Sequence, residues 1–221
     1  MSARRIAVVS AGLSQPSSTR LLADRLAAAT IAALGARGVE ASAETFELRD
    51  LARDVTNNLV TGFPSPALES AIERVTAADG LIAVTPIFTT SYSGLFKSFI
   101  DVLDPASLTD MPVLLGATGG SERHSLAIDY AMRPLFAYLH ARPVTTGVFA
   151  ASADWGRGAQ PGQEDAASGL HDRIARAAAE LATAIVQSTR DAGARDPFAP
   201  PDGSAGLRSG LSQVGAYGET R

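Results

Sequence analysis

The chain has 221 residues, of which 46% are hydrophobic and 19% are charged, with a formal net charge of −4 and no cysteine. A chain of this length buries enough apolar surface to fold without disulfides or a structural metal, and the lack of cysteine excludes thiolate nucleophiles and cysteine zinc sites. Histidine is also scarce, since only His124, His140 and His171 are present. We therefore expect no metal site. We also expect no nucleic acid or anionic membrane as a partner, because those surfaces attract basic proteins.

We expect no targeting signal at the start of the sequence. Arg4 and Arg5 precede a short apolar run that ends at Ser10, which is too soon for a secretory signal. No apolar stretch reaches the roughly 18 residues that a membrane-spanning helix needs. We therefore expect a cytoplasmic protein that acts on small molecules.

Short apolar segments alternate with longer segments of helical periodicity. The expected strands are residues 6–10, 39–46, 81–85, 113–116 and 144–150. The expected helices are residues 18–34, 66–78, 91–103, 122–140 and 163–190. Alternation of strand and helix predicts a parallel sheet that is covered by helices on both faces. The fold class is therefore α/β, a doubly wound five-stranded parallel sheet with the flavodoxin-like order 2-1-3-4-5.

The composition changes after residue 190, where proline, glycine and serine become frequent. A segment of this kind has little apolar surface with which to offset the entropy lost on ordering. We expect residues 1–190 to form one flavodoxin-like domain and residues 191–221 to form a mobile tail.

Ligands of open parallel sheets bind beyond the carboxyl ends of the strands, where the strand order reverses. The loop after the first strand, residues 10–20, carries several serines, one glycine and Arg20, which together suit an anion at a helix N-terminus. A plain helix cap by Ser17 or Ser18 explains the same serines equally well. The loop lacks the Gly-Lys-Ser/Thr of a Walker A motif and the three spaced glycines of the dinucleotide fingerprint.

Two further loops are expected at the same edge of the sheet. Residues 85–97 offer backbone amides, small hydroxyl groups and the rings of Phe88 and Tyr92, as a flat heteroaromatic ligand requires. Gly119 and Gly120 follow the fourth strand and let the backbone approach a ligand closely. Each feature also occurs in ordinary turns and caps, but the three loops together indicate one binding site.

The segment Thr85-Pro-Ile-Phe-Thr-Thr-Ser-Tyr-Ser-Gly-Leu-Phe-Lys, followed by Asp101, resembles a segment of the flavodoxin-like NAD(P)H-dependent FMN reductases. Residues 117–120, His124 and residues 126–135 are similar to the subgroup that supplies reduced flavin to sulfonate-desulfonating monooxygenases. The resemblance covers residues 4–190. It implies that hydride passes from NADPH or NADH to N5 of FMN, while the protein supplies orientation and electrostatics without a catalytic residue of its own.

The resemblance also implies which residues contact FMN. The phosphate would lie at the loop after the first strand, and the ring and ribityl chain would lie at the other two loops. The implied contacts are Ser10, Ser17, Ser18, Thr19, Arg20, Pro86, Ile87, Phe88, Thr89, Ser93, Lys97, Thr118, Gly119 and Gly120. Reduced FMN would pass to a flavin-dependent monooxygenase. A homodimer or homotetramer is further implied, with a helix irregularity near Tyr130 at a subunit contact.

Two rival functions remain open. An FMN-containing quinone or azo reductase would share the fold and hold its flavin tightly. A flavodoxin-type electron carrier would be more acidic and would shield the flavin ring with aromatic residues, whereas this chain has a single tryptophan, Trp155. A receiver-type signalling module is excluded, because it needs an aspartate where Thr85 and Pro86 stand.

Overall fold

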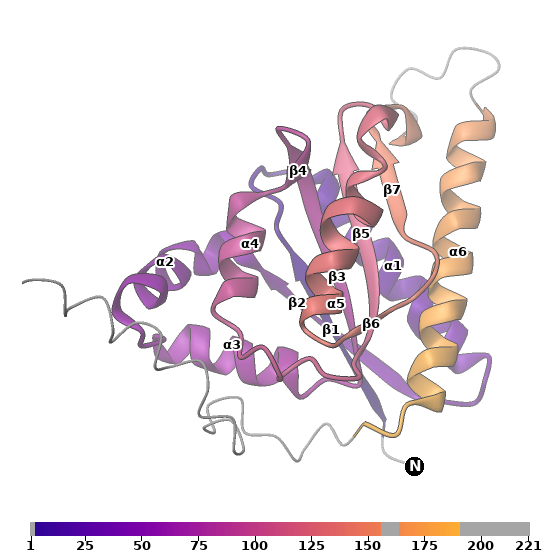
Figure 1. Ribbon diagram of the computed structural model, residues 1–221. Coiled ribbons are helices and arrows are strands. Elements are labelled where there is room, and N and C mark those ends of the chain that lie inside the picture. The colour runs from indigo at the N-terminus through magenta and orange to yellow at the C-terminus, as the bar shows by residue number, and fades with distance from the viewer. Residues whose placement is uncertain (1–2, 156–163, 191–221) are drawn as a thin grey trace, which may run out of the picture.

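The computed structural model describes residues 3–155 and 164–190, and these form a sheet with helices on both of its faces (Figure 1). Within the described residues the sheet has seven strands: β1 (Arg4–Ser10), β2 (Ala41–Glu47), β3 (Gly80–Phe88), β4 (Ser91–Tyr92), β5 (Pro112–Gly119), β6 (Arg142–Pro143) and β7 (Val148–Ala151). The longer helices are α1 (Ser18–Gly35), α2 (Ala52–Thr61), α3 (Pro66–Thr76), α4 (Gly94–Asp101), α5 (Arg133–Tyr138) and α6 (Glu164–Gln187). Short helical segments are η1 (Leu48–Leu51), η2 (Glu122–His124), η3 (Ile128–Met132) and η4 (Ser152–Trp155).

The strand order is β2-β1-β3-β5-β6, with β7 also paired to β5 and β4 paired to β3. Every pairing is parallel except the short one between β3 and β4. Since β5 is the fourth parallel strand, and β6 and β7 together occupy the place of the fifth, this is the expected order 2-1-3-4-5. The doubly wound, flavodoxin-like α/β fold is confirmed.

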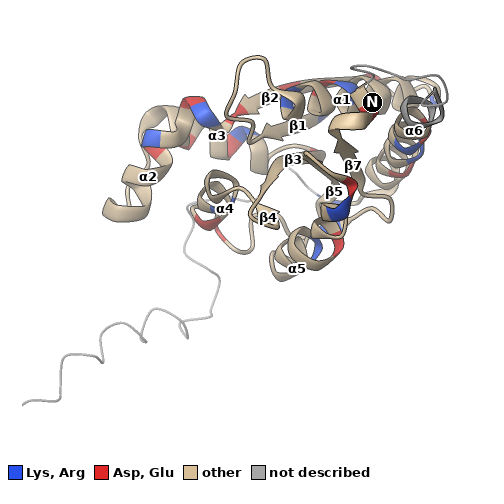
Figure 2. Cartoon of the chain, turned by 90° about the horizontal axis from the view of Figure 1, so that it is seen from above, with Lys and Arg blue, Asp and Glu red and all other residues tan. Residues whose placement is uncertain are grey.

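Each face of the sheet packs against its own set of helices. Ile6 and Val8 of β1 belong to the core that α1 and α6 cover, whereas Ala7 and Val9 belong to the core that α3, α4 and α5 cover. Figure 2 shows α1 and α6 on one side of the sheet and α4 and α5 on the other. Burial on both faces explains why the central strands β3 and β5 are nearly continuous apolar runs in the sequence, whereas the edge strand β2 is mostly exposed or half-buried.

The fifth strand differs from the expected segment 144–150. It is divided into β6 and β7, and Gly147 lies between them. A Cβ atom on Gly147 would lie 2.6 Å from Cγ2 of Ile128, so η3 packs directly against the backbone at this position. The division of the strand therefore accompanies a close helix contact that the apolar pattern does not reveal.

The expected helix over residues 122–140 is interrupted. The π-helix η3 precedes α5, and the backbone N–H of Arg133 donates to the carbonyl of Ile128, five residues earlier. Pro134 has no N–H group to donate to an ordinary helical hydrogen bond, which favours an irregular helix here. The irregularity contains Tyr130, as the resemblance implies.

Two other helices differ from expectation. The expected helix 91–103 begins later, at Gly94, because Ser91 and Tyr92 pair with β3 as β4. The sequence did not predict α2, which buries only Val55 and ends at Gly62 with a φ of 79°. The expected tail, residues 191–221, lies outside the described residues and stays a prediction.

Candidate active site

A pocket of about 380 Å³ opens at the carboxyl edge of the sheet, where the loops after β1, β3 and β5 converge. Nine of the fourteen expected contacts line it: Ser17, Ser18, Thr19, Pro86, Ile87, Phe88, Thr118, Gly119 and Gly120. The remaining five, Ser10, Arg20, Thr89, Ser93 and Lys97, are not among the residues that line it. The expectation that three sequence-distant loops form one site is therefore met in geometry.

The loop after β1 is held by the first turn of α1. Ser17 caps this helix, and its Oγ accepts from the backbone N–H of Arg20 at 3.2 Å. A Cβ atom on Gly12 would overlap Oγ of Ser17, so only glycine lets the loop fold back on its own cap. Ser17 therefore both caps the helix and lines the pocket. In the sequence alone these two roles appear as alternatives.

The loops after β1 and β5 are joined by a hydrogen bond between two buried hydroxyl groups. Oγ1 of Thr19 lies 2.8 Å from Oγ1 of Thr118. Beyond Thr118, a Cβ atom on Gly119 would lie 2.8 Å from Cζ of Phe149, so the backbone runs close to the next strand. The threonine pair therefore holds the start of α1 against the end of β5, and the close contact at Gly119 holds the end of β5 against β7.

The segment after β3 forms a small hairpin. Ile87 pairs with Tyr92 across it, and its turn residues Thr89 and Thr90 have positive φ angles of 48° and 72°. Phe88 is 49% exposed at the pocket wall. The hairpin thus presents backbone and an aromatic ring to the pocket, while Thr89 in its turn is not among the residues that line it.

Two expected contacts have structural partners instead. Ser93 is buried and caps α4, with its Oγ accepting from the N–H of Phe96 at 3.2 Å and its own N–H donating to Oγ1 of Thr85 at 3.1 Å. The Lys97 ammonium group pairs with Asp101 one turn later, at 2.6 Å. In this structure both residues support α4 beside the pocket.

Four lining residues were not among the expected contacts: Leu13, Ser14, Ser152 and Trp155. Ser152 and Trp155 follow β7, at the same edge of the sheet as the other three loops. No motif follows this strand, so nothing in the sequence singles out these two residues. The Trp155 ring also lies under the guanidinium of Arg25, 5.1 Å from the ring centre.

Similarity to known proteins identifies the family of the chain. Residues 4–156 match the family of NADPH-dependent FMN reductases. The chain belongs to this family. As a member it is an oxidoreductase that acts on FMN with a reduced nicotinamide nucleotide, and the resemblance seen in the sequence is confirmed.

Relatives of the reductase carry names of the same kind. It is 36% identical over 151 residues to "FMN reductase (NADPH)" of Pseudomonas aeruginosa, which covers 68% of this chain and 78% of the relative. It is also 36% identical over 149 residues to "NADH-dependent FMN reductase SfnE" of Pseudomonas putida, covering 67% and 77% of the two chains. The two relatives are equally similar to the reductase, but one is named for NADPH and the other for NADH.

Solved structures agree with the fold. An oxidoreductase from Corynebacterium diphtheriae is 46% identical, with a TM-score of 0.78, and the match covers 85% of the reductase and 99% of that chain. The apo form of an NADH:FMN oxidoreductase named EMOB is 27% identical, with a TM-score of 0.66 over 90% and 98% of the two chains.

Arg20 of the reductase pairs with two carboxylates and does not line the pocket. Its Nε donates to Asp24 at 2.7 Å and its Nη1 donates to Glu47 at 2.7 Å. The hydrogen bond to Asp24 is the main reason why the pKa of Arg20 is raised above its usual value, and Glu47 adds to the effect. The Arg20 guanidinium is therefore charged at neutral pH.

Ser10 lies at the end of β1 and is fully buried. Its Oγ has no hydrogen-bond partner among the described residues. Buried hydroxyl groups are nearly always hydrogen-bonded to protein, water or a ligand. The hydroxyl group of Ser10 is therefore suited to a hydrogen bond with a polar atom of a ligand.

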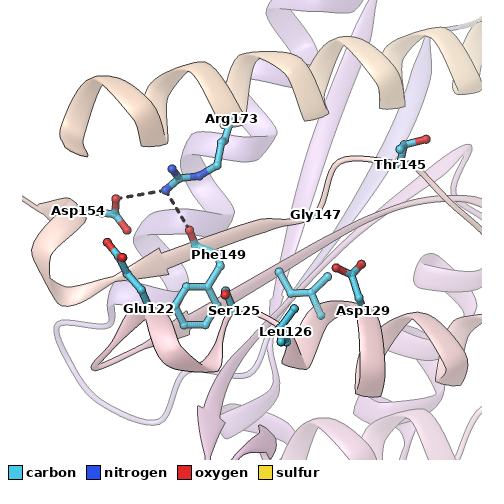
Figure 3. Close-up of a pocket in the computed structure, with 10 residues that line it drawn as sticks. Glu122, Ser125, Leu126, Asp129, Thr145, Gly147, Phe149, Asp154 and Arg173 are labelled. Atoms are coloured by element: carbon cyan, nitrogen blue, oxygen red, sulfur yellow. Dashed lines mark hydrogen bonds and ion pairs between the residues drawn. The ribbon is translucent and has the colours of Figure 1, made fainter. Parts of the chain in front are cut away.

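A second cavity of about 390 Å³ lies between η3, β7 and α6 (Figure 3). Three carboxylates, of Glu122, Asp129 and Asp154, line it together with one guanidinium, that of Arg173. Arg173 is already engaged, since it donates to Asp154 at 3.2 Å and to the carbonyl of Phe149 at 3.3 Å. This excess of negative charge opposes a flavin phosphate, which favours the carboxyl-edge pocket as the flavin site.

Within residues 3–155 and 164–190, no group of three or more His, Asp or Glu side chains is placed to hold a metal ion. None of the helices in that part of the chain is long and apolar enough to cross a membrane.

Proposed function

We propose that FMN binds in the carboxyl-edge pocket of this reductase, with its phosphate at the loop after β1 and its ring between the loops after β3 and β5. The observation that carries this proposal is the convergence of those three loops on one pocket of about 380 Å³. Pockets of a few hundred cubic ångströms with apolar walls and a few polar groups are typical of small-molecule sites.

The residues at the phosphate end fit an anion. Ser10, at the end of β1, has a buried hydroxyl group without a hydrogen-bond partner among the described residues. Of the residues that line the pocket, Ser17, Ser18 and Thr19 bring hydroxyl groups to the start of α1. The N–H groups in the first turn of a helix point outward and attract negative charge. These groups support a phosphate site built from hydroxyl and amide donors.

The residues at the ring end fit a flat, partly polar group. Pro86, Ile87 and Phe88 form an apolar wall, and Thr118 to Gly120 bring backbone to the opposite side. When bound, FMN accepts a hydride at N5 from NADPH or NADH. The protein's part is to hold the ring still, to leave one face open to the nicotinamide, and to direct backbone amides toward the edge where negative charge grows.

We further propose that reduced FMN leaves the reductase and is received by a flavin-dependent monooxygenase. The family resemblance of residues 117–135 supports this role. The test is an anaerobic assay in which NADPH or NADH is oxidised with FMN, with riboflavin and without flavin, followed by ultrafiltration. Flavin-dependent oxidation with the reduced flavin in the filtrate supports the proposal. Retention of stoichiometric flavin with rapid quinone turnover would favour the quinone reductase alternative.

We also propose that the reductase associates into a homodimer or homotetramer. The support is that three large apolar side chains of neighbouring segments, Leu126, Tyr130 of η3 and Tyr138 of α5, are 60%, 79% and 71% exposed. Light scattering of the purified protein tests this, and a monomer at micromolar concentration would contradict it.

A further inference from the structure

Among the described residues, none of the side chains that line the proposed flavin pocket is charged. The described residues that line it carry hydroxyl groups, apolar groups and backbone only. The phosphate of FMN carries between one and two negative charges at neutral pH and usually pairs with arginine or lysine. Riboflavin has the same ring and ribityl chain without this phosphate, so a comparison of the two ligands isolates its contribution.

Two arginines lie immediately behind the phosphate loop. Arg20 belongs to the first turn of α1, and Arg49 belongs to η1, directly after β2. Nη1 of Arg49 donates to the carbonyl of Ser14 at 3.3 Å, and Ser14 lines the pocket. Both cations are therefore near enough to influence the phosphate, but neither lines the pocket.

Glu47, the last residue of β2, is ion-paired with both arginines. Its Oε1 accepts from Nη1 of Arg20 at 2.7 Å. Its Oε2 lies 3.1 Å from Nε of Arg49, an ion pair without hydrogen-bond geometry, since that Nε has no hydrogen-bond partner among the described residues. The carboxylate is only 16% exposed, so water screens these pairs little. Asp24 and Asp50 complete the cluster, at 2.7 Å from Arg20 and 3.5 Å from Arg49. Two guanidinium groups thus face three carboxylates, which leaves no net positive charge for a ligand.

We propose that Glu47 is a specificity-determining residue of the reductase. By holding Arg20 and Arg49, it keeps their charge away from the flavin phosphate, so the phosphate binds to neutral donors and the enzyme discriminates little between FMN and riboflavin. This inference rests on the proposed binding of FMN in the carboxyl-edge pocket. A weakly held phosphate also suits a flavin that must leave after it has been reduced.

The test compares the dissociation constants of FMN and riboflavin, read from the quenching of tryptophan fluorescence. Trp155 is the only tryptophan and lines the pocket, so the signal reports binding without turnover. In Glu47→Gln at least Arg49 loses its nearest carboxylate. We expect the preference for FMN over riboflavin to rise about three- to tenfold, the range for a partly exposed charge that gains a phosphate contact. The matched control is Glu44→Gln on the same strand, which loses an exposed ion pair to Arg74 and should leave the preference unchanged.

An unchanged preference in folded Glu47→Gln protein, or a parallel loss of both ligands, would overturn the assignment of Glu47. The wild-type protein provides a second measurement that does not depend on any variant. Affinity for FMN and for riboflavin should change equally little as salt is raised, because no unpaired cation among the described residues lines the pocket. A steep salt dependence for FMN alone would overturn the proposal as well. If neither flavin binds the wild-type protein, the proposed pocket itself fails, which is a different outcome from flavin binding without an effect of Glu47.

Discussion

Thr19 and Thr118, which are 99 positions apart in the sequence, share a buried hydrogen bond of 2.8 Å between their hydroxyl oxygens. The bond joins the start of α1 to the end of β5, and both residues line the pocket. Two of the three loops that form the site are therefore connected to each other as well as to the sheet.

Replacement of either threonine by valine should loosen this connection. Thr19→Val leaves the hydroxyl of Thr118 buried without its partner, and we expect the free energy of unfolding to fall by about 1–2 kcal/mol, with weaker flavin binding. The double variant Thr19→Val/Thr118→Val should lose less than the sum of the single variants, because no unpaired hydroxyl remains. Chemical denaturation of the wild-type protein, the single variants and the double variant measures these free energies of unfolding. Strict additivity would show that the two hydroxyl groups are not coupled.

Gly12 should be intolerant of a side chain, because a Cβ atom there would overlap Oγ of Ser17. Gly12→Ala should displace the cap of α1 at a cost of about 1 kcal/mol and should weaken FMN binding through the altered loop. Gly35→Ala is the matched control, since its Cβ would meet nothing within 4 Å at the other end of the same helix. It should be neutral or slightly stabilising. Wild-type FMN affinity in Gly12→Ala would contradict the proposed role of the loop.

Arg190 follows α6 and binds to the edge of the sheet that lies opposite the pocket. Its guanidinium donates to four carbonyl oxygens, those of Thr76, Ala78, Ser107 and Thr109, at 2.7 to 3.1 Å. Arg190→Gln should lower the free energy of unfolding by about 2–3 kcal/mol, because charged donors make the stronger hydrogen bonds.

The matched control for Arg190 is Arg142→Gln. Arg142 is 71% exposed and pairs with Asp110 at 2.8 Å, so its loss should cost less than about 1 kcal/mol. Flavin reduction should be unaffected in both variants, since neither residue is near the pocket. Equal stability of the two variants would show that the four carbonyl contacts of Arg190 contribute little.

The sheet and the location of the site could be predicted because both depend on patterns that are local in the sequence. Strands buried on both faces are apolar throughout, and parallel strands bring their following loops to one edge. Helix α2 was not predicted, because it is only ten residues long and buries only Val55. The pairing of Arg20 with Glu47 could not be predicted either, since Glu47 reaches it through pairing of β1 with β2 across 27 positions. The side chain most suited to a phosphate is therefore held by a residue that no motif connects to it.

The most direct test of the proposed flavin site is a crystal structure of the reductase with FMN bound. We predict that the isoalloxazine ring lies between residues 86–88 and 118–120 and that the phosphate lies near Ser10 and Ser17 to Thr19. We also predict that Glu47 is still in contact with Arg20 and Arg49. Flavin in the cavity beside Glu122, Asp129 and Arg173 would contradict the proposed site. A direct contact of Arg20 or Arg49 with the phosphate would contradict the role assigned to Glu47.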